Sequence, residues 1–166
     1  MSTTPADEVD HIVEAWQRER PDLDVAPLQV LSRVRRLSRH LDLARESAFA
    51  EHDLEGWGFD VLSALRRAGA PYELSPGQLV AQTLVTSGTM TNRVDRLAAR
   101  GLVARGPDLH DRRGVKVTLT VAGRALVDAA LSDLLDHERI LLSQLPPSER
   151  DDLAELLRRL LSPFEL

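Results

Sequence analysis

Cysteine is absent from the 166 residues of this chain. That absence excludes disulfide bonds, thiolate catalysis, Cys-ligated zinc, iron–sulfur clusters and thiol-based redox sensing. Aromatic residues make up only 4% of the sequence, and leucine, valine and alanine supply most of its apolar side chains. This composition favours helices over an aromatic-rich β-sandwich.

Long apolar runs are missing as well. No uninterrupted apolar stretch approaches the roughly 18 residues of a membrane-spanning helix. The first ten residues are acidic and polar, whereas a secretory signal begins with basic residues and continues with an apolar segment. We therefore expect a protein of a reducing compartment, cytoplasmic and without a membrane partner.

Charge is unevenly distributed along the chain. The formal net charge is −5, yet residues 33–45 hold five basic residues against one acidic residue, and residues 86–116 hold seven against three. Because charges act over about 10 Å at moderate ionic strength, these segments can meet an anionic partner although the whole chain is acidic. All basic residues except Lys116 are arginines, whose planar guanidinium suits phosphates and guanine edges.

Apolar spacing predicts three helices in the first part of the chain. The first is capped by Thr4 and ends before Pro21. The second follows Pro27 and shows apolar residues three and four positions apart. The third covers about residues 58–68, and Gly69 provides a left-handed C-terminal cap.

A helix-turn-helix is predicted next. The sequence SPGQ at residues 75–78 is a capping box with proline in the first helical position, and it opens a short helix. After a break at residues 85–87, residues 88–100 form a second helix that Gly101 caps. Its small polar side chains permit close approach to DNA, and its arginines can bind base edges or phosphates. The candidate DNA-binding residues here are Ser87, Thr89, Thr91, Asn92, Arg93 and Arg96.

A β-hairpin with a basic tip follows this motif. Residues 102–105 and 115–119 have the apolar pattern of short strands, and turn-forming residues separate them. Such a hairpin has the form of a wing, whose Arg112 and Arg113 are placed to enter an adjacent minor groove. One neighbour cannot satisfy two adjacent arginines at the tip of a turn, so we assign both to DNA.

Two more helices complete the chain. Thr120 caps a long helix, and Pro146 and Pro147 interrupt the chain after it. The last helix has a leucine face, formed by Leu153, Leu156, Leu157, Leu160 and Leu161. These features predict a mainly α fold with a small β wing.

This order of elements resembles the MarR family of bacterial transcription regulators over nearly the whole chain. The motifs that carry the resemblance are SGTMTNRVDRL at residues 87–97, RGLV at 100–103, DRR at 111–113 and LTVAG at 119–123. It implies a winged helix-turn-helix in an intertwined helical homodimer, which binds a pseudo-palindromic operator in double-stranded DNA. It also implies that Asp111 in the wing pairs with an arginine of the recognition helix, for which Arg96 is the candidate.

The resemblance implies a division of the chain by role. The N-terminal helices in residues 1–55 serve dimerisation and ligand binding. The winged helix-turn-helix in residues 56–124 binds DNA. The C-terminal helices in residues 125–166 serve dimerisation.

The resemblance narrows to the urate-responsive branch of the family. That branch has a tryptophan on an extra N-terminal helix, an aspartate and an arginine seven residues apart before the recognition motif, and arginines in the recognition helix and the first wing strand. The matching residues are Trp16, Asp60, Arg67, Arg93 and Arg105. The resemblance implies that a small anionic ligand, urate or a related purine, releases the protein from its operator. An indole can offer this ligand an apolar plate and an N–H donor, and a guanidinium can pair with its charge.

Other functions stand beside this hypothesis. An aromatic acid or a citrate-like acid could replace the purine, and the citrate-like acid would need the arginines but not Trp16. A non-specific architectural DNA binder is disfavoured, because such proteins are usually basic throughout. An enzyme is the remotest alternative: the five histidines are isolated, and the sequence has no metal-binding histidine pair, phosphate-cradling glycine loop or nucleophile elbow. We expect no catalytic residues, no metal and no cofactor.

Overall fold

The computed structural model describes residues 5–108 and 114–165. The chain divides into two compact units, residues 1–45 and residues 46–166. Four residues singled out in the sequence lie outside the described residues: Thr4, Asp111, Arg112 and Arg113.

The first unit contains α1 (Glu8–Glu19) and most of α2 (Pro27–Ala50). The sequence predicts a start of the first helix at Thr4, but α1 begins later because Asp7 is its N-cap. The Asp7 carboxylate accepts hydrogen bonds from the backbone N–H groups of Val9 and Asp10, at 2.8 and 3.1 Å. The Asp10 carboxylate accepts in return from the Asp7 N–H at 2.8 Å, so this reciprocal box fixes where the helix starts.

A small apolar cluster and an ion-pair network join α1 to α2 within this unit. Val9 and Val13 of α1 are buried with Val25, and Leu28 packs against them. The Arg33 guanidinium of α2 donates to the carboxylates of two residues at the start of α1, Asp7 at 2.9 Å and Asp10 at 2.8 Å.

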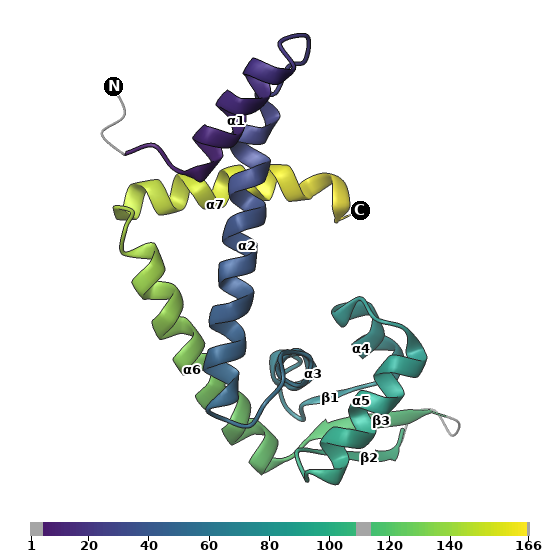
Figure 1. Ribbon diagram of the computed structural model, residues 1–166. Coiled ribbons are helices and arrows are strands. Elements are labelled where there is room, and N and C mark those ends of the chain that lie inside the picture. The colour runs from purple at the N-terminus through teal and green to yellow at the C-terminus, as the bar shows by residue number, and fades with distance from the viewer. Residues whose placement is uncertain (1–4, 109–113, 166) are drawn as a thin grey trace. The chain divides into compact units, whose positions relative to one another are not determined.

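The second unit is mainly helical with one small sheet, in the order predicted from the sequence (Figure 1). Its elements are α3 (Gly56–Arg67), β1 (Glu73–Leu74), α4 (Pro76–Thr83), α5 (Ser87–Ala99), β2 (Val103–Pro107), β3 (Val115–Leu119), α6 (Val121–Leu142), α7 (Pro147–Leu161) and the short 3-10 helix η1 (Ser162–Phe164). The two-residue strand β1 and the short 3-10 helix η1 are the elements that the sequence pattern missed.

Local capping explains where the two helices of the helix-turn-helix begin. The Ser75 hydroxyl accepts from the Gln78 N–H at 3.2 Å, and the Gln78 side chain accepts from the Ser75 N–H at 2.8 Å, which confirms the predicted box. Thr86 caps α5 through a hydrogen bond from the Thr89 N–H at 3.3 Å. Helix α5 therefore begins at Ser87, one residue earlier than predicted.

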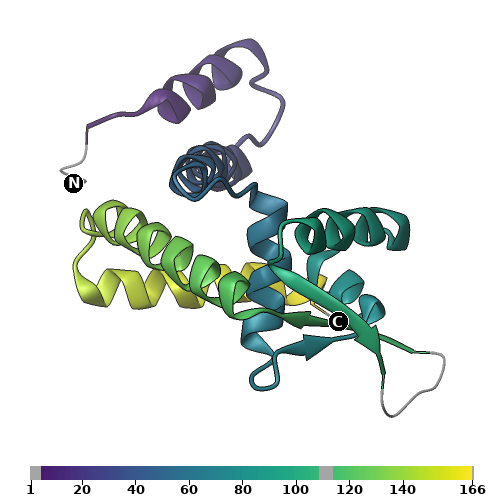
Figure 2. The same cartoon turned by 90° about the horizontal axis from the view of Figure 1, so that it is seen from below.

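The sheet is antiparallel, with strand order β1-β3-β2. Strands β2 and β3 pair over their whole length, from Val103 opposite Leu119 to Pro107 opposite Val115, and α6 starts where β3 ends (Figure 2). Thr120 is the N-cap of α6, as predicted, and its hydroxyl accepts from the Gly123 N–H at 3.0 Å.

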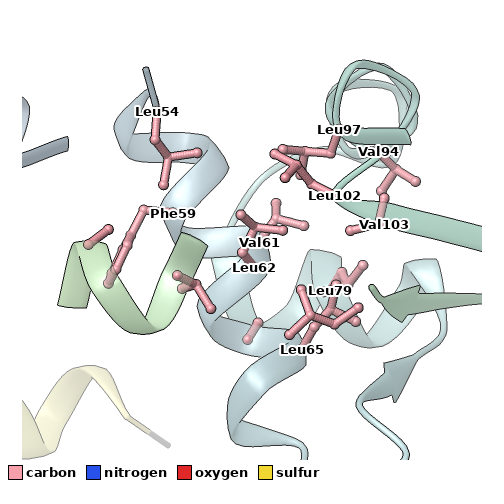
Figure 3. Packing of buried hydrophobic residues seen from close by; sticks show 14 of the residues in the cluster. Leu54, Phe59, Val61, Leu62, Leu65, Leu79, Val94, Leu97, Leu102 and Val103 are labelled. Carbon is pink, nitrogen blue, oxygen red and sulfur yellow. The ribbon is translucent and has the colours of Figure 1, made fainter. Parts of the chain in front are cut away.

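A single apolar core holds α3, α4, α5 and the sheet together. Figure 3 shows Leu62 and Leu65 of α3 packed with Leu79 of α4 and Leu97 of α5, and all four side chains are fully buried. Because these leucines interdigitate, the position of α5 on α3 is set by side-chain packing. The outward face of α5 is thereby left for other contacts.

Candidate nucleic-acid interface

The outward face of α5 carries the polar side chains predicted to bind DNA. Met90, Val94 and Leu97 are buried at helical spacing and turn the opposite face outward. The exposed candidates on α5 are Ser87, Thr89, Thr91, Asn92 and Arg96, and Arg93 is partly buried. This face presents hydroxyl, amide and guanidinium groups, which are the groups that contact base edges and phosphates.

Two of the hydroxyls on this face also serve the helix itself. The Thr89 hydroxyl lies 2.9 Å from that of the capping Thr86, and the Thr91 hydroxyl donates to the Ser87 carbonyl at 3.1 Å. Both oxygens keep acceptor lone pairs, but their orientation is restricted. Asn92 is exposed and offers both a donor and an acceptor from one amide, which suits recognition of adenine.

The arginines of α5 turn toward the corner between α2 and α3. The Arg96 guanidinium lies 4.5 Å from the ring centroid of Trp57 and donates to the Glu55 carboxylate. The Arg93 guanidinium lies 5.6 Å from the same ring centroid. Two cation–π contacts therefore meet on one indole.

Glu55 belongs to this corner instead of capping its own helix. It occupies the N-cap position of α3, yet its side chain makes no capping hydrogen bond. Its carboxylate accepts from the Trp57 indole N–H and from Arg96. The Trp57 N–H first, and Arg96 second, lower the pKa of Glu55 below its ordinary value, so the carboxylate is ionised at neutral pH.

A cavity of about 750 Å³ lies at the same corner. Trp57 and Arg96 line it together with Glu55, Asp53 and Arg100. Arg100 is paired with Asp53 at 3.7 Å. The cavity thus combines an aromatic plate with two guanidinium groups, each of which already has a carboxylate partner.

The sequence did not single out Glu55 or Trp57 as site residues. Arg96 lies 41 positions after Glu55, and no motif links the two. A tryptophan in the first turn of a helix is most often a packing residue, so only the folded chain reveals its arginine partners.

The predicted ligand residues on α3 share one face. Asp60 and Arg67 are seven residues apart, about two helical turns, and both are exposed. Ser63 lies between them, and its hydroxyl accepts from the Arg67 guanidinium at 2.8 Å. The structure therefore brings these two predicted residues onto the same surface.

The other predicted ligand residues have different neighbours. Arg93 lies over Trp57, whereas Arg105 on β2 is paired with Asp95 of α5 at 2.8 Å. Trp16 is on α1 in the first unit, with 49% of its surface exposed. The contacts of Arg93 and Arg105 thus point to two different sides of α5.

The described ranges contain neither a membrane-spanning helix nor a cluster of metal-ligating side chains. Across residues 5–108 and 114–165, none of the helices has the length and apolarity needed to span a membrane. Over the same ranges, no three histidine, aspartate or glutamate side chains gather closely enough to hold a metal ion.

Comparison with known proteins places the chain among transcription regulators. The model of the MarR family matches residues 52–114, which contain α3 to β2. The HTH-type transcriptional regulator PecS of Dickeya dadantii is 40% identical over 152 residues, covering 92% of each chain. The HTH-type transcriptional repressor NicR of Pseudomonas putida is 33% identical, covering 86% of this chain and 91% of the relative.

The chain is also similar to solved structures of transcription regulators. Bordetella bronchiseptica BpsR, whose DNA binding is regulated by 6-hydroxynicotinic acid, is 32% identical with a TM-score of 0.67, covering 79% of this chain and 91% of BpsR. A MarR variant of E. coli complexed with operator DNA is 26% identical with a TM-score of 0.70, covering 94% of this chain and 99% of that one. With the winged helix-turn-helix and the polar face of α5, these similarities show that the chain belongs to the MarR family and is a DNA-binding transcription regulator, not an enzyme.

Proposed function

We propose that the chain acts as a homodimeric repressor that leaves its operator when a small anionic aromatic ligand binds, with urate or a related purine as the first candidate. The outward polar face of α5 is the observation that carries the DNA-binding part of this proposal. In this proposal α5 lies in the major groove, where Asn92 contacts base edges, and the wing residues Arg112 and Arg113 enter the minor groove.

Exposed leucines on α7 support the homodimer. None of the residues of α7 is buried in the single chain. Leu156, Leu157, Leu160 and Leu161 are 37–53% exposed, and Phe164 just beyond them is more exposed still. A contiguous apolar face of this kind marks an association surface. We infer that a second copy covers it, as in the intertwined dimers implied by the resemblance, with residues 125–166 and the helices of residues 1–55 in the interface.

The ligand part of the proposal rests on the chemistry of five residues. A flat anionic heterocycle would use the indole of Trp16 as a plate. Arg67, Arg93 and Arg105 would be its cationic partners, and Asp60 the group with which it competes. Arg93 already contacts α3 through Trp57, so a ligand that draws Arg93 away would shift α5. Coupling of about 1–3 kcal/mol is enough to change DNA affinity 5- to 150-fold.

Titration of the protein–DNA complex with urate tests whether a purine is the ligand. The DNA is a duplex selected by this protein from a random pool. Urate at micromolar to millimolar concentration should dissociate the protein from this duplex. Trp16→Phe should keep dimer and DNA affinity while losing about 1–2 kcal/mol of urate affinity, the scale of one unmade hydrogen bond. An unchanged complex at millimolar urate would remove the purine from the proposal but leave DNA binding intact.

An aromatic acid is the second candidate ligand. The cavity lined by Trp57, Arg96 and Arg100 could take such an acid, whose carboxylate would compete with Glu55 or Asp53 for a guanidinium. The similarity to BpsR, whose DNA binding responds to 6-hydroxynicotinic acid, adds support. Arg100→Gln should weaken a response to that acid and leave a urate response unchanged, whereas Trp16→Phe should do the reverse.

A further inference from the structure

Arg93 and Arg96 of α5 and Arg100 at its C-cap form a stripe, and the three guanidinium groups differ in how many contacts they make. Arg93, Arg96 and Arg100 follow one another at spacings of three and four, which places them on one side of the helix. Arg93 lies over the Trp57 ring. Arg96 lies closer to that ring and is also paired with Glu55.

The contacts of Arg96 are mutually supporting. The Trp57 N–H donates to the same Glu55 carboxylate that receives Arg96, so the indole fixes the carboxylate as well as the guanidinium. Glu55 also follows the buried Leu54 and opens α3, so its backbone is held by the core. A guanidinium that moved to a phosphate would lose a charge-assisted hydrogen bond and a cation–π contact together.

We propose that Glu55 and Trp57 are positioning residues that withhold Arg96 from the DNA backbone, so that Glu55 limits sequence-independent binding. This inference rests on the proposed function, in which α5 is the helix that contacts DNA. From the sequence, Arg96 was expected to bind DNA and to pair with Asp111, which lies outside the described residues. In this proposal Arg96 instead holds α5 against the α2–α3 corner. Arg93, for which no carboxylate partner is found among residues 5–108 and 114–165, is the arginine of the stripe that reaches phosphate.

The slope of log affinity against log salt concentration measures how many phosphates a protein neutralises, at about 0.9 for each contact. We would measure it with a random-sequence duplex for the wild type, Glu55→Gln, Arg96→Ala and the double variant. Glu55→Gln should free Arg96, steepen the slope by about 0.9 for each subunit bound, and tighten binding to random DNA several-fold at low salt. Arg96→Ala should have the same slope as the wild type.

The double variant separates a released arginine from a simple loss of negative charge. If Glu55 acts through Arg96, Glu55→Gln in the Arg96→Ala background should add nothing to the slope. A matched control is Asp128→Asn. The Asp128 carboxylate is paired with the Arg66 guanidinium of α3 at 2.8 Å, and its removal should leave the slope at the wild-type value. Because the side chains of Arg96 and Glu55 are 54% and 56% exposed, these variants should fold, and thermal unfolding verifies this.

Three results would overturn the inference: a flatter slope for Arg96→Ala alone, a wild-type slope for Glu55→Gln, or an equal steepening by Glu55→Gln with and without Arg96. Failure of the proposed function looks different. In that case Arg93→Ala and the double wing variant Arg112→Ala with Arg113→Ala would leave DNA affinity and slope unchanged. If those variants act while Glu55→Gln is silent, only the inference about Glu55 fails.

Discussion

The carbonyl oxygen of Leu102 occupies the space that a side chain on Gly123 would need. A Cβ built on Gly123 would lie 2.0 Å from that oxygen and 2.9 Å from a methyl group of Leu119. Because Gly123 lies in the first turn of α6 and Leu102 directly precedes β2, the absence of a side chain lets the helix start against the sheet.

Gly123→Ala should therefore destabilise the fold by about 2–3 kcal/mol, the upper part of the usual range for overpacking, because backbone must move. Chemical denaturation measures the loss. Gly56→Ala is the matched control, since nothing lies within 4 Å of a Cβ there and Gly56 also opens a helix. The control should be neutral or stabilise slightly. Equal stability of both variants would show that the close approach is relieved at little cost.

Leu84→Asn should stabilise the protein. Leu84 ends α4 in the left-handed region with φ of 53°, and the residue is 91% exposed, so leucine has a backbone cost here without gaining burial. Asparagine adopts this conformation more readily, and we expect a gain of about 1 kcal/mol in the free energy of unfolding. Val121→Asn, at a helical position that is also well exposed, should give no such gain. A loss at Leu84 would indicate that its side chain has a partner in the assembled protein.

The contact between α1 and α2 in the first unit should weaken in acid. Arg33 lowers the pKa of Asp7, and the Asp7 N–H and Arg33 together lower the pKa of Asp10, from the ordinary value of 3.8. Because these pKa values are depressed on folding, their stabilising effect is complete above the ordinary carboxyl pKa and is lost as the pH falls through the lowered values.

Arg33→Gln tests this ion-pair network. It should loosen α1 at pH 7, and its difference from the wild type should shrink below about pH 4, where the carboxylates protonate. Trp16 fluorescence reports on α1 when Trp57→Phe is present in both proteins, because those are the two tryptophans. A difference that stays constant down to pH 3 would contradict the role of the two carboxylates.

Asn92→Ala and the wing variants should affect DNA binding in different ways. Asn92→Ala should relax discrimination at one or two base pairs by about 1–3 kcal/mol, because a base contact is lost. Arg112→Ala or Arg113→Ala should weaken binding to all sequences and flatten the salt slope, because each removes a charge from the backbone or minor groove. Gel shifts with the selected duplex and single-base variants measure both effects. Normal binding by the wing variants would place the tip outside the groove.

If the ligand binds Arg105, Asp95→Asn should allow the ligand to release DNA at a lower concentration. Arg105 is paired with Asp95 on α5, so a ligand that binds Arg105 has to displace this carboxylate. Removal of the charge should lower the ligand concentration for half-release of DNA by a few-fold, consistent with the modest strength of an exposed ion pair. Titration of the DNA complex with urate measures it. No shift, with an intact urate response, would show that Arg105 does not contact the ligand.

The amino-acid sequence by itself determined the helices, their order and most of their ends. The box of Ser75 and Gln78, the cap at Thr120 and the left-handed Gly69 and Gly101 were all readable, because a capping bond joins residues two to four positions apart. The same kind of capping signal gave the wrong start for the first helix, because Asp7, and not the predicted Thr4, is its N-cap.

The tertiary structure alone decided which residues far apart in the sequence meet. Strand β1 pairs Glu73 with Thr118, and Glu55 binds Arg96, across 45 and 41 positions of the chain. The sequence could mark Arg96 as a DNA-binding residue and Arg105 as a ligand-binding residue, but their carboxylate partners depend on how α5 packs against α3 and β2. Such packing is set by the whole core, which holds long-range neighbours together without a local sequence signature.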